Sequence, residues 1–255
     1  MSDAGPRATT LRMSWPNIGA RFRGYKAPGD SRSVFLVSKV QLDARKFAPL
    51  FAQGARVVVV GQPDEASVVQ RCSLPGGVEL RVPASAFTQV NQHVNQELVK
   101  AVLQFAARHG VASFVDAYAG AGNFTLPLLA HGLTGEALDN HAAGIYCARG
   151  LARDQGFSHH GFQVGDAGML MESFAATKRR FDLILLDPPR EGAKNALHAA
   201  LRLRPQLVIL IACDPVALAR DLKWLVAAGG RVESLTIFDM FPQTHHFETM
   251  ATVVV

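Results

Sequence analysis

Two short apolar runs constrain the fold of this chain more than any other feature. They are Phe181–Leu186 and Leu207–Ile211, and neither shows the apolar–polar alternation of a half-exposed strand. Runs of this kind are typical of central parallel strands, which helices cover on both faces of the sheet. We therefore expect these two segments to form the middle of a buried, mostly parallel sheet.

From Ala112 onward, strand-like runs alternate with helical patterns, which predicts crossover helices between parallel strands. Seven such runs occur, and the last two are separated only by residues 241–247, too few for a crossover helix. They should form a terminal antiparallel hairpin. Before the first run, Asn91–His109 has apolar residues at helical spacing and Asn91 as a plausible N-cap. The prediction is a doubly wound α/β fold with a mostly parallel, seven-stranded sheet.

The chain has 255 residues, of which 49% are hydrophobic, enough for a packed core. No apolar run is long enough to span a membrane, and the first residues lack the layout of a signal peptide. Cys72, Cys147 and Cys213 lie far apart, without the spacing of a metal site or a disulfide framework. We expect a cytoplasmic protein, a monomer without a metal ion.

The first ninety residues differ from the rest in both pattern and charge. Residues 1–33 are rich in Arg, Gly and Pro and are expected to be partly disordered, and residues 34–90 contain short β-rich pieces typical of a small antiparallel appendage. Residues 1–90 hold 12 Lys and Arg against 6 Asp and Glu, a net charge of +6, whereas residues 91–255 have a net charge of −1. A basic appendage suits a polyanion such as RNA, although a solvated basic face has the same composition.

The segment Asp116–Phe124 follows the first run and contains Gly120 and Gly122. Glycines in a strand-to-helix turn let the backbone approach a bound cofactor, although such turns also serve as simple tight connections. A dinucleotide motif would require a third glycine where Thr125 stands, so NAD is disfavoured. Asp139 and Asp166 end the next two strands, where acids could bind ribose hydroxyls and lie beside adenine. An adenosyl ligand is the interpretation these positions favour.

The fourth and fifth strands end in residues that could take part in a reaction. Asp187 and two prolines precede Arg190, a segment that could also serve only to stop a strand and start a helix. Methyltransferases that act on base amino groups typically have an aromatic residue after such prolines. None follows here, which argues against that reaction. Cys213 ends the fifth strand just before a helix, a position that favours a thiolate, although most such cysteines are small buried hydrophobes. Glu248 starts the last strand, so a nucleophile and a base are predicted in one pocket.

At these residues the chain resembles the RNA uracil-5-methyltransferase family, whose members are class I, S-adenosylmethionine-dependent enzymes with a Rossmann-like fold. Five motifs of that family occur here in order: Phe87–Asn91, Asp116–Phe124, Asp187–Gly192, Ala212–Asp221 and Asp239–Glu248. The resemblance covers the whole domain predicted for residues 91–255.

The resemblance implies methyl transfer from S-adenosylmethionine to carbon 5 of a uridine in tRNA or rRNA, with Cys213 adding to carbon 6 of uracil and Glu248 acting as base. It implies that the cofactor is bound by Gln89, Tyr118, Gly120, Asn123, Asp139 and Asp187. Cytosine is disfavoured because the cysteine that cytosine-5 enzymes place after the proline is absent. Two other functions stay open: an RNA-binding or RNA-folding protein with vestigial methyl transfer, and methylation of a small uracil-containing metabolite.

The chain also departs from the family pattern. We expect it to lack the N-terminal oligonucleotide-binding barrel of many members and the iron–sulfur site of some, for which it has too few cysteines. Ala212 and Asp214 replace the usual serine and asparagine beside the nucleophile, and an inward-pointing Asp214 would oppose thiolate formation. The pairs His159–His160 and His245–His246 lack partners at metal-ligand spacing and are interpreted as surface or motif residues.

Overall fold

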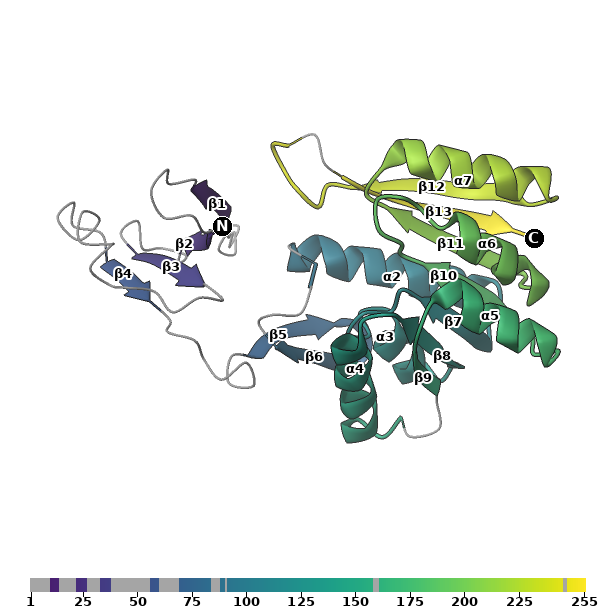
Figure 1. Ribbon diagram of the computed structural model, residues 1–255, viewed down its shortest axis with the longest axis horizontal. Coiled ribbons are helices and arrows are strands. Elements are labelled where there is room, and N and C mark those ends of the chain that lie inside the picture. Colours follow the sequence, from purple (N-terminus) through teal and green to yellow (C-terminus); the bar gives the residue numbers. More distant parts are fainter. Residues whose placement is uncertain are drawn as a thin grey trace. The chain divides into compact units, whose positions relative to one another are not determined.

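The computed structural model of the chain describes residues 10–13, 22–26, 33–37, 56–59, 69–83, 88, 89, 91–157, 161–244 and 247–255 (Figure 1). The chain divides into two compact units, Met1–Val68 and Val69–Val255, which are described separately.

The first unit contains a four-stranded sheet in the order β1-β2-β3-β4. Its strands are β1 (Thr10–Met13), β2 (Phe22–Lys26), β3 (Ser33–Val37) and β4 (Arg56–Val59). β1, β2 and β3 pair antiparallel, but β3 and β4 are parallel. The expectation of an entirely antiparallel appendage is therefore wrong at this pair, because the chain between Val37 and Arg56 is long enough for a crossover connection.

The second unit begins with a hairpin that the sequence had assigned to the appendage. β5 (Val69–Leu74) and β6 (Val78–Pro83) pair antiparallel around the short 3-10 turn Pro75–Gly77. Its apolar side chains, Cys72, Leu74, Val78, Leu80 and Val82, are all buried in the core of the second unit. Gln96 Nε2 donates to Ser73 O at 2.8 Å and Cys147 Sγ lies 3.2 Å from Arg81 O. The compact unit thus starts at Val69, before the predicted boundary at Asn91.

A seven-stranded sheet forms the centre of this unit, in the order β12-β13-β11-β10-β7-β8-β9. The strands are β7 (Ser113–Ala117), β8 (Thr134–Asp139), β9 (Gly161–Val164), β10 (Leu183–Leu186), β11 (Leu207–Ala212), β12 (Arg231–Phe238) and β13 (Glu248–Val254). β7 to β11 run parallel, and β13 inserts antiparallel between β11 and β12. The predicted doubly wound sheet with a terminal antiparallel hairpin is confirmed.

Among the described residues, six helices cover the sheet: α2 (Gln92–Arg108), α3 (Thr125–Ala130), α4 (Ala142–Asp154), α5 (Ala167–Ala176), α6 (Lys194–Arg202) and α7 (Pro215–Ala227). Two apolar clusters, one on each face of the sheet, show the layering: side chains of α2, α3 and α4 belong to one, and those of α5, α6 and α7 to the other. β10 and β11 are buried along their whole length, as their continuous apolar runs predicted.

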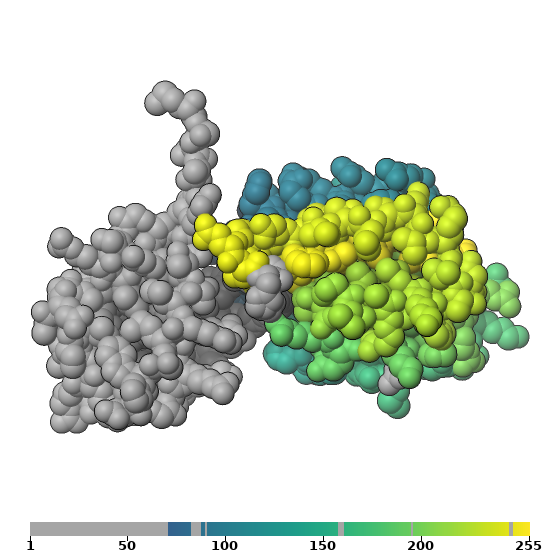
Figure 2. Space-filling model, turned by 90° about the horizontal axis from the view of Figure 1, so that it is seen from above, coloured from purple at the N-terminus to yellow at the C-terminus, as the bar shows by residue number. Residues whose placement is uncertain are grey.

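Polar contacts fix the ends of α2. The Asn91 side chain caps the helix by accepting from Val94 N at 3.3 Å, as predicted. At the other end, His109 Nε2 lies 2.8 Å from Glu233 Oε2 of β12. Figure 2 shows the blue surface of α2 bordering the yellow surface of the C-terminal strands. No helix among the described residues is long and apolar enough to cross a membrane.

The central strands should dominate the stability of this unit. Leu185 is 0% exposed, so Leu185→Ala should leave a cavity and lower the free energy of unfolding by about 3 kcal/mol. Urea unfolding followed by circular dichroism measures the loss. Val226→Ala on α7, where the side chain is 51% exposed, is the control and should change it by less than about 0.5 kcal/mol. Equal losses for the two variants would contradict this account of the core.

Candidate active site

The carboxyl ends of β7, β8, β10 and β11 meet at one edge of the sheet, where open α/β folds bind their ligands. The turn after β7 depends on backbone conformations with positive φ at Tyr118 (70°), Gly120 (54°) and Gly122 (93°). A Cβ on Gly122 would lie 3.0 Å from Leu126 Cγ, whereas one on Gly120 would meet no atom within 4 Å. Gly122 therefore serves packing, and Gly120 borders open space that a ligand could enter.

Asp139 connects this turn to the end of β8. Its Oδ2 accepts from Gly120 N at 2.8 Å, and its Oδ1 accepts from His141 N at 2.7 Å. The carboxylate is half-buried and lies against the glycine turn, where it could also accept from hydroxyl groups of a ligand. Gly144 of α4, which the sequence analysis missed, lets this turn close, because a Cβ there would be 2.8 Å from Gly120 O.

Asp116 lies beneath the turn and is 0% exposed. Thr125 Oγ1 donates to its Oδ2 at 2.5 Å, while its Oδ1 is buried without a hydrogen-bond partner among the described residues. Burial raises the pKa of this carboxyl to about 7, and the Asp139 charge adds to the effect. The residue that excluded a dinucleotide motif, Thr125, thus hydrogen-bonds an acid at the ligand edge.

Two of the predicted cofactor residues, Asn123 and Gln89, lie near α2. Asn123 and Asn95 form a reciprocal amide pair, with Asn95 Nδ2 to Asn123 Oδ1 at 2.8 Å and Asn123 Nδ2 to Asn95 Oδ1 at 3.0 Å. This pair fastens the glycine turn to α2. Gln89 is half-buried just before α2, next to residues 84–87 and 90, which lie outside the described part of the chain.

A cleft of about 310 Å³ opens beside the turn, between the first turns of α5 and α6. Tyr118, Asp166, Gly168 and Ala193 contribute to its lining, and Asp166 also caps α5 by accepting from Met169 N at 2.9 Å. With the open space at Gly120 and the unpartnered Asp116 oxygen, this cleft supplies acceptors and room for an adenosyl amino-acid ligand. The residues present therefore fit the predicted cofactor.

The strand register brings Cys213 and Glu248 to the same place. Ala212 of β11 pairs with Thr249 of β13, so Cys213 follows and Glu248 precedes the last rung of this antiparallel ladder. Glu248 is 7% exposed, and Cys213 is half-buried. Directly opposed residues in an antiparallel ladder have Cβ atoms about 5 Å apart. The predicted thiol and carboxyl are thus neighbours at the ligand edge.

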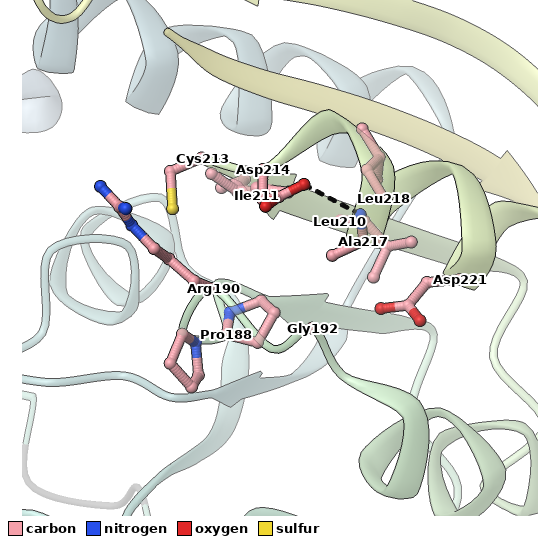
Figure 3. Close-up of a pocket in the computed structure, with 12 residues that line it drawn as sticks. Pro188, Arg190, Gly192, Leu210, Ile211, Cys213, Asp214, Ala217, Leu218 and Asp221 are labelled. Carbon is pink, nitrogen blue, oxygen red and sulfur yellow. Dashed lines mark hydrogen bonds between the residues drawn. The ribbon is translucent and has the colours of Figure 1, made fainter. Parts of the chain in front are cut away.

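Desolvation and neighbouring charges control both groups. Burial raises the pKa of Glu248 to about 7, although Arg190 opposes the shift. Burial also raises the pKa of the Cys213 thiol; Glu248 and Asp187 raise it further, and Arg190 lowers it. Arg190 is the described cation that favours the ionised form of both groups. Figure 3 shows its side chain and the Cys213 sulfur on the same side of a small pocket.

Asp187, at the end of β10, has a pKa well above its ordinary value, because it is desolvated and lies near Glu248 and Asp116. Three acids therefore share one poorly solvated region, where full ionisation of all three would be unfavourable. This site suits a group that takes up or releases a proton near neutral pH.

Asp214 is engaged at the N-terminus of α7. Its Oδ1 accepts from Val216 N at 2.8 Å and from Ala217 N at 3.1 Å, which caps α7 (Figure 3). Asp214 is not among the charged groups that raise the pKa of the Cys213 thiol, which are Glu248 and Asp187.

Among the described residues, no group of three His, Cys, Asp or Glu side chains could hold a metal ion. Both predicted histidine pairs, 159–160 and 245–246, lie outside the described residues.

Comparison with known proteins identifies relatives of this chain. Residues 169–254 match the family model described as tRNA (Uracil-5-)-methyltransferase. A 23S rRNA (uracil(1939)-C(5))-methyltransferase RlmD of Aeromonas hydrophila is 35% identical over 175 residues, which are 69% of this chain and 40% of the relative. The enzyme of that name from Pseudomonas entomophila is 32% identical over 232 residues, 88% of this chain and 51% of the relative.

A solved structure shares the fold. The tRNA (uracil-54, C5)-methyltransferase of Pyrococcus abyssi, in complex with S-adenosyl-L-homocysteine, superposes with a TM-score of 0.67 at 21% identity, over 92% of this chain and 59% of that one. The chain spans about half or less of the length of the curated relatives it matches. The family-model match and the relatives at 35% and 32% identity show that the chain belongs to the RNA uracil-5-methyltransferase family.

Proposed function

We propose that this chain transfers a methyl group from S-adenosylmethionine to carbon 5 of a uridine in RNA. The observation that carries the proposal is the strand register that ends with Ala212 paired to Thr249, one residue before Cys213 and one residue after Glu248, beside a glycine turn with room for a cofactor. A thiol and a carboxyl in one desolvated region supply the nucleophile and the base that this reaction needs.

The cofactor would lie along the edge formed by the glycine turn, Asp139 and the cleft near Asp166. When bound, S-adenosylmethionine supplies an electrophilic methyl group on a sulfonium sulfur. Gly120 gives it close access to the backbone, and Asp139 offers acceptors for its ribose hydroxyls. The unpartnered Asp116 oxygen could accept from an ammonium group. Asp187, Tyr118, Asn123 and Gln89 stay predicted cofactor residues.

Cys213 acts as the nucleophile of the reaction and Glu248 as its base. Carbon 5 of uracil is a weak nucleophile, so the Cys213 thiolate first forms a bond to carbon 6, which makes carbon 5 electron-rich. Carbon 5 then bonds to the methyl group, and the methyl–sulfur bond of the sulfonium breaks. Glu248 next takes the proton from carbon 5, and the bond between carbon 6 and Cys213 breaks to return the thiolate. Arg190 favours both anions of this cycle.

The nucleic acid partner is proposed to be tRNA or rRNA, since the family model is named for tRNA and the relatives for 23S rRNA. Residues 34–90, which lie in the segment 1–90 with its excess of positive charge, are a proposed RNA-contacting region. A cytoplasmic monomer without a metal ion stays a prediction.

Tritiated S-adenosylmethionine with separate tRNA and rRNA pools that lack 5-methyluridine tests the proposal directly. Label recovered in 5-methyluridine would support it and identify the RNA class. Label in 5-methylcytidine or a methyladenosine would contradict the choice of base. RNA binding without labelling would instead favour the RNA-binding function, and transfer to a free uracil compound would favour a metabolite enzyme.

Removal of the nucleophile should abolish turnover without loss of the fold. Cys213→Ala should lower methyl transfer at least about 1000-fold, because no other thiol of the described chain lies at the pocket. Isothermal titration with S-adenosylhomocysteine should show nearly unchanged cofactor affinity. Cys147→Ala is the matched control, since this half-buried thiol contacts Arg81 O instead, and it should retain activity. Substantial turnover by Cys213→Ala would exclude Cys213 as the nucleophile.

Loss of the base should trap the covalent adduct. Glu248→Gln keeps the side-chain shape but cannot take the carbon 5 proton, so a protein–RNA species should accumulate and resist denaturing electrophoresis. Glu97→Gln, on the exposed surface of α2, removes a carboxylate elsewhere and should behave as the unchanged protein. A Glu248→Gln variant with normal turnover and no adduct would remove Glu248 from the role of base.

The release step should depend on pH with a midpoint set by Glu248. A carboxyl whose pKa is raised to about 7 is protonated below that pH and becomes a competent base above it. Decay of the adduct, followed by rapid quench between about pH 6 and about pH 8, should therefore accelerate with rising pH and be half-maximal at about pH 7. A rate independent of pH over this range would show that proton removal by Glu248 does not limit release.

A further inference from the structure

The segment Leu218–Asp221 belongs to a family motif but has no role in the chemistry described above. Asp221 lies on the second turn of α7 and is only 4% exposed. Its Oδ2 accepts from Ala193 N at 2.8 Å, and its Oδ1 accepts from Arg220 Nε at 3.0 Å and Arg220 Nη2 at 2.9 Å. Arg220 Nη2 also donates to Glu191 O at 2.8 Å. Two consecutive side chains of α7 thus hold the backbone of the loop after β10.

Gly192 shows how closely this loop lies against α7. Its φ is +83°, and a Cβ there would be 2.3 Å from Arg220 Nη2 and 2.7 Å from Asp221 Oδ2. A side chain at this position would have to displace both the loop and its anchors. The residues from Asp187 to Ala193 are therefore fixed to the helix that begins two residues after Cys213.

The same loop carries Arg190, whose position matters to the nucleophile. Arg190 and Cys213 line one small pocket with Asp221 at its far side (Figure 3). The other charged groups that act on the thiol are Glu248 of β13 and Asp187 of the loop, both acidic. Asp214, the remaining acid beside Cys213, is engaged at the N-terminus of α7. Arg190 is thus the described cation that offsets these acids.

We propose that Asp221 is a positioning residue: by anchoring the Asp187–Ala193 loop to α7, it keeps Arg190 beside Cys213 and Glu248 and so favours the ionised nucleophile. Asp221 touches neither the proposed substrate nor the reacting atoms and acts through Arg190. The inference rests on the proposed function for its purpose, but the coupling of Asp221 to the thiol is a property of the protein alone.

The sign of one substitution separates this role from a direct effect of charge. Asp221→Asn removes a negative charge, which by itself would favour the thiolate and lower the pH at which Cys213 ionises. Release of the loop would withdraw Arg190 and raise that pH. A purely structural role would lower stability and leave the thiol of the folded protein unchanged.

Alkylation of the full chain by iodoacetamide across a pH series, with each cysteine peptide quantified by mass spectrometry, gives the ionisation midpoint of Cys213 without RNA or cofactor. We expect Asp221→Asn to raise this midpoint by about half a pH unit, the order expected for partial loss of one nearby charge. Cys147 in the same sample is an internal reference and should keep its midpoint. An unchanged or lowered Cys213 midpoint would overturn the proposal.

A double-mutant cycle identifies Arg190 as the intermediary. Arg190→Gln should raise the Cys213 midpoint by itself, and Asp221→Asn should then add little in that background. Equal shifts in both backgrounds would show that Asp221 does not act through Arg190. Glu172→Gln is the matched control, since it removes a carboxylate paired with Arg202 on the surface of α5, and it should leave the midpoint unchanged.

A second variant keeps the test decisive if Asp221→Asn does not fold. Gly192→Ala displaces the loop without any change of charge and should raise the Cys213 midpoint in the same direction. A folded Gly192→Ala protein with the original midpoint would contradict the proposal. Failure of the methyl-transfer assay would overturn the proposed function but not this coupling, because the alkylation readout does not depend on turnover.

Discussion

The antiparallel insertion of β13 between β11 and β12 is the interaction on which the candidate site depends. Its register, with Ala212 paired to Thr249, joins a strand end at Cys213 to a strand start at Glu248. A parallel β13 would have presented its carboxyl end at this edge instead and left Glu248 at the opposite edge. Because a shift of one residue would turn Glu248 to the other face, the register of β13 with β11 also determines where the carboxyl points.

The charged groups of the site influence one another's ionisation. Asp116, Asp187 and Glu248 lie in one desolvated region, and each has a raised pKa because water is excluded or other acids are near. Such a group of acids holds protons near neutral pH and disfavours a thiolate beside it. Arg190 opposes both tendencies at Cys213 and Glu248, so the location of one guanidinium influences the nucleophile and the base at once.

Sequence patterns were sufficient for the central fold but not for its boundary. β10 and β11 were predictable because strands buried on both faces need uninterrupted apolar residues, and the short link before β13 excluded a crossover. The β5–β6 hairpin resembles the appendage in composition. Only its tertiary contacts, such as Gln96 with Ser73 O, show that it belongs to the second unit.

For the candidate site residues, too, the sequence predicts positions along the chain but not tertiary contacts. A motif locates Asp139 and Asn123 along the chain, but not the partners they bind. Asp139 accepts from Gly120 N, and Asn123 pairs with Asn95 of α2, a residue that no motif identified. Long-range hydrogen bonds of this kind depend on packing, which local spacing does not encode. Arg220 and Asp221 are a further case, since they join α7 to the loop between β10 and α6.

The two departures from the family pattern beside Cys213 are Ala212 and Asp214. Their contacts lie on the side of the sheet that α7 covers. Asp214 is engaged by the first turn of α7, where a carboxylate is favoured by the helix dipole and keeps its charge directed at the Val216 and Ala217 amides. Ala212 packs in the cluster on that same face, opposite Thr249, whose buried Oγ1 has no hydrogen-bond partner among the described residues. A serine at position 212 would place a hydroxyl across the ladder from that oxygen. Both departures therefore alter how β11 is joined to α7 and β13, and they leave the pocket side of Cys213 to Arg190 and Glu248.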